Sequence, residues 1–130
     1  PVRWTFTRTP VLSVPAAGAY LGVLRTATAG LAARLQFTLD EIEDLRIAVD
    51  EACAVLLPLA DADARLTARF DLEPGSLQVA VSVPSDATEP PSRNTFAWTV
   101  LTALAGDVEA SVDDGRVTLT LRKTLAVNPG

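Results

Sequence analysis

The sequence has 130 residues, of which 48% are apolar, with a formal net charge of -5, one cysteine and no histidine. This length and apolar content predict one domain, residues 1–130, with its own hydrophobic core. The composition excludes a Ser-His-Asp triad, a histidine base, an internal disulfide and a structural zinc site with four Cys or His ligands. We therefore expect no metal site.

The charge and hydropathy patterns argue against two classes of partner. Eleven basic residues are spread along the chain and outnumbered by sixteen acidic ones, so no basic stripe for nucleic acid is present. No apolar run reaches the roughly 18 residues needed to cross a bilayer. We expect a cytoplasmic protein without direct nucleic-acid or membrane binding. A chain that starts at Pro1 is expected to be trimmed, which leaves room for a lost signal peptide.

The chain begins with an extended segment that leads into a helix. Residues 2–14 are rich in β-branched and aromatic side chains, with a bend expected at Pro10. Segment 16–35 is rich in alanine, and helical spacing is kept by Tyr20, Leu24, Ala27, Leu31 and Leu35. Gly22 and Gly30 weaken this helix by about 1 kcal/mol each relative to alanine, unless another backbone packs closely there.

The second predicted helix has the clearest start. Thr38 and Glu41 have the spacing of a capping box, and Pro58 ends the helix. Acidic residues crowd positions 40–44, where they match the positive end of the helix dipole or, alternatively, form a docking patch for a basic partner. The core stripe of this helix is predicted to contain Ile42, Leu45, Val49, Cys53 and Leu56.

The second half of the chain is predicted to form mainly strands. Alternating patterns predict strands at 66–72, 77–83, 107–112 and 117–122. A short helix is expected at 94–105, with one face formed by Phe96, Val100 and Leu104. The order β-α-α-β-β-α-β-β predicts an α+β fold: a two-layer α/β sandwich whose mixed, mainly antiparallel sheet carries helices on one face.

Three side chains of the two long helices are candidates for function. Glu51 falls opposite the core stripe, with Ile47 and Val55 one turn to either side. Partial desolvation there would suit a general base, whereas the alternative is a surface carboxylate whose apolar neighbours pack on a strand. Cys53 is expected to pack in the core rather than to act in redox chemistry. Arg25 is either a solvated charge or an interface anchor.

Four segments of the sequence match the pattern of a known family: VLSVPA at 11–16, LR at 24–25, TLDEI at 38–42 and LRIAVDEA at 45–52. Together they resemble the anti-sigma-factor serine kinases of the RsbW/SpoIIAB type, which are GHKL (Bergerat-fold) ATPases. The family's late helix and last strand are similar to residues 96–108 and 116–123, so the resemblance extends over 11–123. It implies the GHKL sandwich, a homodimer, a sigma factor as partner and a STAS-type anti-anti-sigma factor as antagonist.

The resemblance also assigns site positions, and those for nucleotide are degraded. Glu51 takes the position of the catalytic base, and Arg25 that of an arginine implicated in contacting the sigma factor or its antagonist. Val55 replaces the asparagine that helps hold Mg²⁺ on ATP, and a valine has no oxygen to offer a hard cation. Residues 83–95 contain no glycine, although the family has an Asp-x-Gly-x-Gly loop and a Gly-rich phosphate lid there.

These losses favour a binding protein over an enzyme. The leading hypothesis is an anti-sigma factor that sequesters a sigma factor by protein contacts, with weak or lost ATP binding. No cofactor is firmly predicted, since ATP and Mg²⁺ follow from the resemblance alone. One alternative is an active serine kinase that phosphorylates a STAS-type anti-anti-sigma factor, with Glu51 as base. Another is a dimerisation or sensory module of a larger protein.

Overall fold

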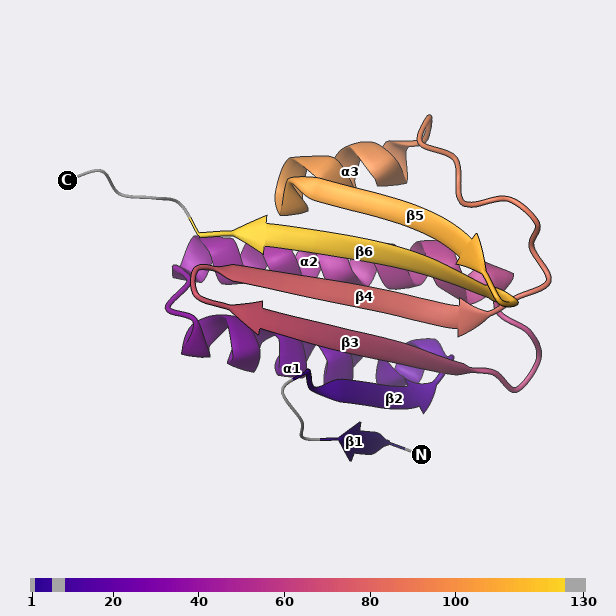
Figure 1. Cartoon of the computed structure of the whole chain (residues 1–130), viewed down its shortest axis with the longest axis horizontal. Coiled ribbons are helices and arrows are strands. Elements are labelled where there is room, and N and C mark those ends of the chain that lie inside the picture. Colours follow the sequence, from indigo (N-terminus) through magenta and orange to yellow (C-terminus); the bar gives the residue numbers. More distant parts are fainter. Residues whose placement is uncertain (1, 6–8, 126–130) are drawn as a thin grey trace.

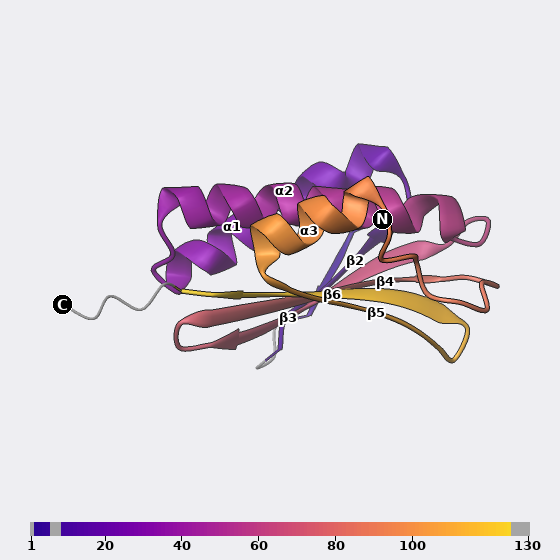
Figure 2. The same cartoon turned by 90° about the horizontal axis from the view of Figure 1, so that it is seen from above.

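The structure, a computed structural model, describes residues 2–5 and 9–125. These residues form two layers, in which three α-helices lie on one face of a six-stranded sheet (Figure 2). The two-layer α+β sandwich expected from the sequence is therefore confirmed. Within the described ranges, every helix is too short or too polar to span a membrane.

The sheet has the strand order β1-β2-β3-β4-β6-β5, and all five pairings between described strands are antiparallel (Figure 1). The strands are β1 (Arg3–Thr5), β2 (Val11–Pro15), β3 (Arg65–Glu73), β4 (Ser76–Pro84), β5 (Asp107–Asp113) and β6 (Arg116–Thr124). Tight turns join β3 to β4 and β5 to β6. Gly75 and Gly115 have φ values of 74° and 71° there, a conformation that favours glycine.

The three helices are α1 (Leu21–Arg34), α2 (Leu39–Leu56) and α3 (Phe96–Ala105). The first one begins later than its composition predicts, because Pro15 still pairs with Arg65 in the sheet and the Ala16 amide donates to the Ala64 carbonyl. A 3-10 turn, Gly18–Tyr20, then leads into the α-helix.

The capping box predicted for α2 is confirmed. The Thr38 amide donates to the Glu41 carboxylate at 2.8 Å, and the Glu41 amide donates to the Thr38 hydroxyl at 3.1 Å. Pro58 lies in the 3-10 turn Leu57–Leu59 that follows the helix. These contacts fix both ends of α2, the helix that lies over the middle of the sheet.

The core lies between α2 and the inner face of the sheet. On the sheet side, the fully buried residues of the three central strands are Leu66, Ala68, Phe70, Leu77, Val79, Val81, Val83, Val117, Leu119 and Leu121. On α2, four of the five predicted stripe residues are buried, and Ile42 at the start of the stripe is half-buried. Ala48 and Ala52 complete this buried face, where their small side chains let the helix approach the sheet.

The apolar face predicted for α3 is wrong by about one residue. Leu101 and Ala105 are its buried residues, whereas Phe96 is 82% exposed. Almost every residue of this helix is apolar, so periodicity could not select the face. The helix lies at the rim of the helical layer, beside α2 and above β5 and β6, and therefore buries one narrow stripe (Figures 1 and 2).

Candidate functional site

The candidate residues lie around α2, which packs between α1 and α3 (Figure 1). On its α1 side, the Asp50 carboxylate is 3.3 Å from Nε of Arg25. On its other side, the Asp44 carboxylate is 3.7 Å from Nζ of Lys123, which also donates to the Leu104 carbonyl of α3 at 2.7 Å. These two ion pairs identify the two flanks of α2.

Glu51 lies on the α3 flank, seven residues and thus two turns after Asp44. It is half-buried, and none of the described residues forms a hydrogen bond or ion pair with its carboxylate. Of its predicted apolar neighbours, Val55 is half-buried and packs against the core, but Ile47 is exposed. A half-buried carboxylate without a partner has oxygens that are able to accept a hydrogen bond from a substrate. The role of Glu51 as a base stays a prediction.

In the segment before α3, residues 84–95, several backbone amides are not available to a phosphate group. Four amides in or next to it are already bonded within the chain: Ser85 to the Gly115 carbonyl, Ala87 to the Ser85 hydroxyl, Asn94 to the Ser92 hydroxyl and Trp98 to the Thr95 hydroxyl. Prolines at 84, 90 and 91 have no amide hydrogen. Phosphate-binding loops work through free amides, so this segment fits a phosphate poorly.

Side chains also occupy the region where α3 begins. The Arg93 guanidinium lies 5.1 Å from the centre of the Trp98 ring, and Trp98 packs against the core. Sequence reasoning missed this cation–π contact, although an arginine five residues before a tryptophan at a helix start was the available signal. With Val55 on α2 and prolines at 84, 90 and 91, the chain lacks one oxygen ligand and several amide donors that could serve Mg-ATP.

Arg25 and Glu51 are not brought together, because they lie on opposite flanks of α2. The Arg25 side chain is 42% exposed and that of Asp50 39%. The buried Nε of Arg25 makes no hydrogen bond, although it lies within ion-pair distance of Asp50. Sequence reasoning did not single out Asp50, since nothing in a helical pattern pairs a residue of one helix with a residue of the next.

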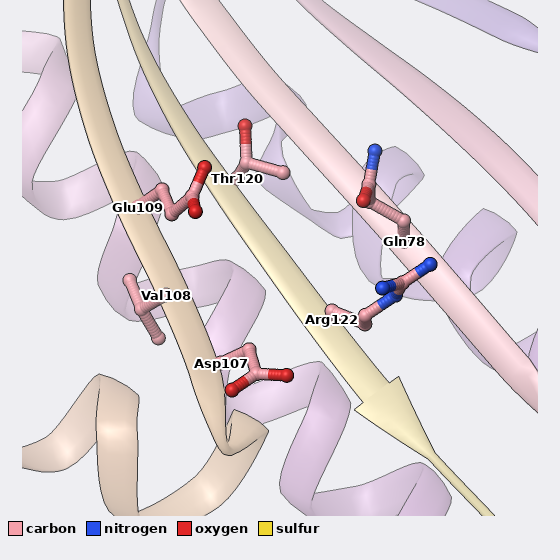
Figure 3. A pocket seen from close by; sticks show the side chains of 6 residues that line it. All are labelled: Gln78, Asp107, Val108, Glu109, Thr120 and Arg122. Carbon is pink, nitrogen blue, oxygen red and sulfur yellow. The ribbon is translucent and has the colours of Figure 1, made fainter.

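Two surface depressions have linings that do not include the candidate side chains, although the second adjoins Arg25 at Gly22. One, of about 200 Å³, is on the sheet face opposite the helices, where Figure 3 shows Gln78, Thr120 and Arg122 beside residues 107–109 of β5. Its charged side chains, Asp107, Glu109 and Arg122, are exposed. The other is an apolar groove of about 710 Å³ between Val2, Leu12 and the stretch of chain from residue 19 to 27.

Cys53 is buried in the core, as expected. Burial and, to a smaller extent, the nearby Asp50 carboxylate together raise the pKa of its thiol from 9.0 to about 12. A thiol with so high a pKa is a poor nucleophile. Among residues 2–5 and 9–125, no three acidic or cysteine side chains are grouped so as to hold a metal ion.

Comparison with known proteins places these features in context. No protein-family model matches the chain. The anti-sigma-F factor RsbW of Mycobacterium tuberculosis is 34% identical over 122 residues, which cover 86% of this chain and 72% of that protein. The serine-protein kinase RsbW of Bacillus subtilis is 38% identical over 79 residues, covering 58% of this chain and 49% of the kinase.

Proposed function

Since the chain belongs to the RsbW family of anti-sigma factors and serine-protein kinases, we propose that it is an anti-sigma factor that sequesters an RNA polymerase sigma factor and binds ATP weakly or not at all. Its identity to an anti-sigma-F factor extends over most of both chains, whereas the match to the serine-protein kinases is shorter. Sequestration needs a complementary surface of about 1,600 Å² and no chemistry.

The state of the segment before α3 is the observation that carries this proposal. Prolines at 84, 90 and 91 have no amide hydrogen, the amides of Ser85, Ala87 and Asn94 are bonded within the chain, and Val55 has no oxygen for Mg²⁺. Phosphoryl transfer depends on positioning and charge stabilisation, and both require those groups. A protein that kept its helices but lost these donors would bind partners without turning over ATP.

The partner-facing features support the same proposal. Arg25 lies on α1 with its side chain partly exposed, as an interface anchor requires. The net charge of -5 would speed association with the basic, DNA-contacting regions of a sigma factor. We further propose that residues 1–130 act as one cytoplasmic domain, that the protein is a homodimer, and that a STAS-type anti-anti-sigma factor releases the sigma factor.

A second candidate function is the active serine kinase. Glu51 favours it, because its half-buried carboxylate has no partner among the described residues and occupies the position of the family's base. In this case Mg-ATP would bind, and Glu51 would accept the proton of the serine hydroxyl.

The deciding experiment uses the sigma factors of the organism that encodes the chain. Each is co-expressed with the tagged chain and purified with and without Mg-ATP, and Mg-ATP is titrated into the chain by calorimetry. We expect one sigma factor to be retained equally in both conditions. We also expect no Mg-ATP binding with a dissociation constant below about 1 mM, the upper end of the range typical of working enzyme sites. Retention of no sigma factor would refute the anti-sigma role.

Arg25→Ala tests the proposed anchor, with Arg34→Ala in the last turn of the same helix as its control. We expect the first variant to weaken retention about tenfold or more and the second to leave it within about twofold. Sub-millimolar Mg-ATP binding, with phosphate transfer to a STAS-type protein that Glu51→Gln abolishes, would instead establish the kinase.

A further inference from the structure

The Nε atom of Arg25 is buried, whereas other atoms of its side chain are exposed to solvent. Its Nε is buried and faces Asp50 at 3.3 Å, while the side chain as a whole is 42% exposed. Since Nε is inaccessible, the exposure comes from other parts of the side chain, which include the terminal nitrogens. The planar guanidinium thus has its Nε side turned toward α2.

The guanidinium of Arg25 also lies against its own helix, beside Gly22. A Cβ at position 22 would be 3.7 Å from a terminal nitrogen of Arg25, so the guanidinium rests beside this glycine. No other backbone packs on Gly22 within 4 Å. Asp50 on one helix and Gly22 on the other therefore bracket Arg25.

This arrangement matters for binding more than for folding. Ion pairs between partly exposed groups typically contribute about 0–1 kcal/mol to stability, so Asp50 is not needed to hold α1 against α2. Free arginine side chains instead lose much rotamer entropy when they bind. A neighbour that fixes the guanidinium beforehand reduces that loss.

Resting on the function proposed above, we propose that Asp50 is a positioning residue for the sigma-factor contact. Its carboxylate holds the Nε side of Arg25 and leaves the terminal nitrogens to bind a carboxylate of the partner. A guanidinium matches a carboxylate through two parallel hydrogen bonds, and its terminal nitrogens supply such a pair. The expected partner group is thus an aspartate or glutamate of the sigma factor.

A competing role for Asp50 predicts the opposite sign. If Asp50 masked Arg25, the partner would have to displace it, and removing the Asp50 charge would tighten binding. The approach from the Nε side argues against masking, because it leaves the terminal nitrogens free. The sign of the Asp50→Asn effect therefore distinguishes positioning from masking.

The test compares Asp50→Asn with Glu43→Gln. Glu43 pairs with Arg46 at 3.0 Å on the same helix, so its variant removes the same charge from α2 without touching Arg25. Affinity is measured by fluorescence anisotropy for the labelled sigma factor retained in the co-purification. We expect Asp50→Asn to weaken binding about 3- to 10-fold and Glu43→Gln to change it less than about twofold.

Two further variants separate positioning from a general structural effect. Asp50→Asn should have no added effect in an Arg25→Ala background, because Asp50 acts through that arginine. Asp50→Glu, which keeps the carboxylate, should recover most of the affinity. Unchanged or tighter binding by Asp50→Asn, while Arg25→Ala still weakens binding, would overturn the inference and leave the proposed function intact.

NMR of the free protein tests the ordering of Arg25 without any partner. The Nε–H resonance of Arg25, assigned by its loss in Arg25→Ala, is expected to exchange slowly with solvent in the native chain. It should shift and exchange faster in Asp50→Asn but not in Glu43→Gln. An unchanged resonance in Asp50→Asn would refute the positioning role, even if no sigma factor were retained and the proposed function had failed.

Discussion

Asp50 and Glu51 are consecutive residues of α2, yet Asp50 pairs with Arg25 of α1 at 3.3 Å while Glu51 lies on the flank toward α3. Successive helical side chains diverge by about 100°, so this short segment presents one carboxylate to each side. The proposed partner contact and the family's catalytic position therefore occupy separate flanks. The proposed loss of nucleotide binding on one flank need not disturb partner binding on the other.

The capping box of α2 makes a measurable contribution to stability. Thr38→Ala removes the acceptor of the Glu41 amide, and we expect the free energy of unfolding to fall by about 1 kcal/mol. Urea denaturation measures the change. Thr26→Ala, at an exposed position within α1, is the control and should be neutral or slightly stabilising. Equal losses in both variants would contradict the capping role.

Gly30 offers a route to a more stable chain. It lies within α1, and an added Cβ would meet nothing within 4 Å, so Gly30→Ala should raise the free energy of unfolding by about 0.5–1 kcal/mol. Gly106, which caps α3 with a φ of 91°, provides the contrast. Gly106→Ala should destabilise the chain in the same denaturation assay, because alanine rarely adopts that conformation. Loss of stability in Gly30→Ala would mean that Gly30 has an unrecognised packing role.

The sequence predicted the sandwich, the start of α2 and the order of the elements from α1 onward, because these depend on local periodicity and capping. It predicted one extended segment at residues 2–14, whereas the structure has two antiparallel strands there, β1 and β2, because strand pairing does not follow from local periodicity. It could not predict the buried face of α3, since an almost wholly apolar helix contains no contrast for periodicity to detect. Nor could it predict the Arg25–Asp50 pair, which joins two helices and depends on how they pack. The site positions of Arg25, Glu51 and Val55 came from family resemblance, and their roles stay predictions.

The buried face of α3 can be tested by truncating one side chain on each face. Leu101→Ala removes a fully buried side chain and should lower the free energy of unfolding by about 2–5 kcal/mol. Phe96 is 82% exposed, so Phe96→Ala should change it by less than about 0.5 kcal/mol. A larger effect at Phe96 than at Leu101 would restore the face predicted from the sequence.

Cys53 should make the protein less stable at high pH. The thiol pKa is 9.0 in the unfolded chain and about 12 in the folded one, so ionisation affects neither state below pH 9 and favours the unfolded state above it. Between pH 8 and 10, the native chain should lose about 1.4 kcal/mol more than Cys53→Ala does. Urea denaturation at both pH values measures the difference. Identical pH dependence in the two proteins would show that the thiol ionises equally in both states.

Restoring one ligand should not restore nucleotide binding. Val55→Asn supplies the side-chain oxygen that the family uses for Mg²⁺, but the segment before α3 still has prolines at 84, 90 and 91 and bonded amides at Ser85 and Ala87. We expect calorimetry to detect no Mg-ATP binding with a dissociation constant below about 1 mM in this variant. Thermal unfolding serves as the control for folding, because an asparagine at this half-buried position costs about 1–3 kcal/mol.

A second variant asks whether the segment itself is the obstacle. If Val55→Asn bound Mg-ATP and the native chain did not, the missing oxygen alone would explain the difference and the amide argument would be wrong. Combining Val55→Asn with glycines at 84, 90 and 91 returns three amides to the segment and removes its most rigid positions. Binding of Mg-ATP by the combined variant but not by Val55→Asn would show that the backbone before α3 prevents nucleotide binding. This result is expected because backbone amides of this kind are the main ligands of bound phosphates.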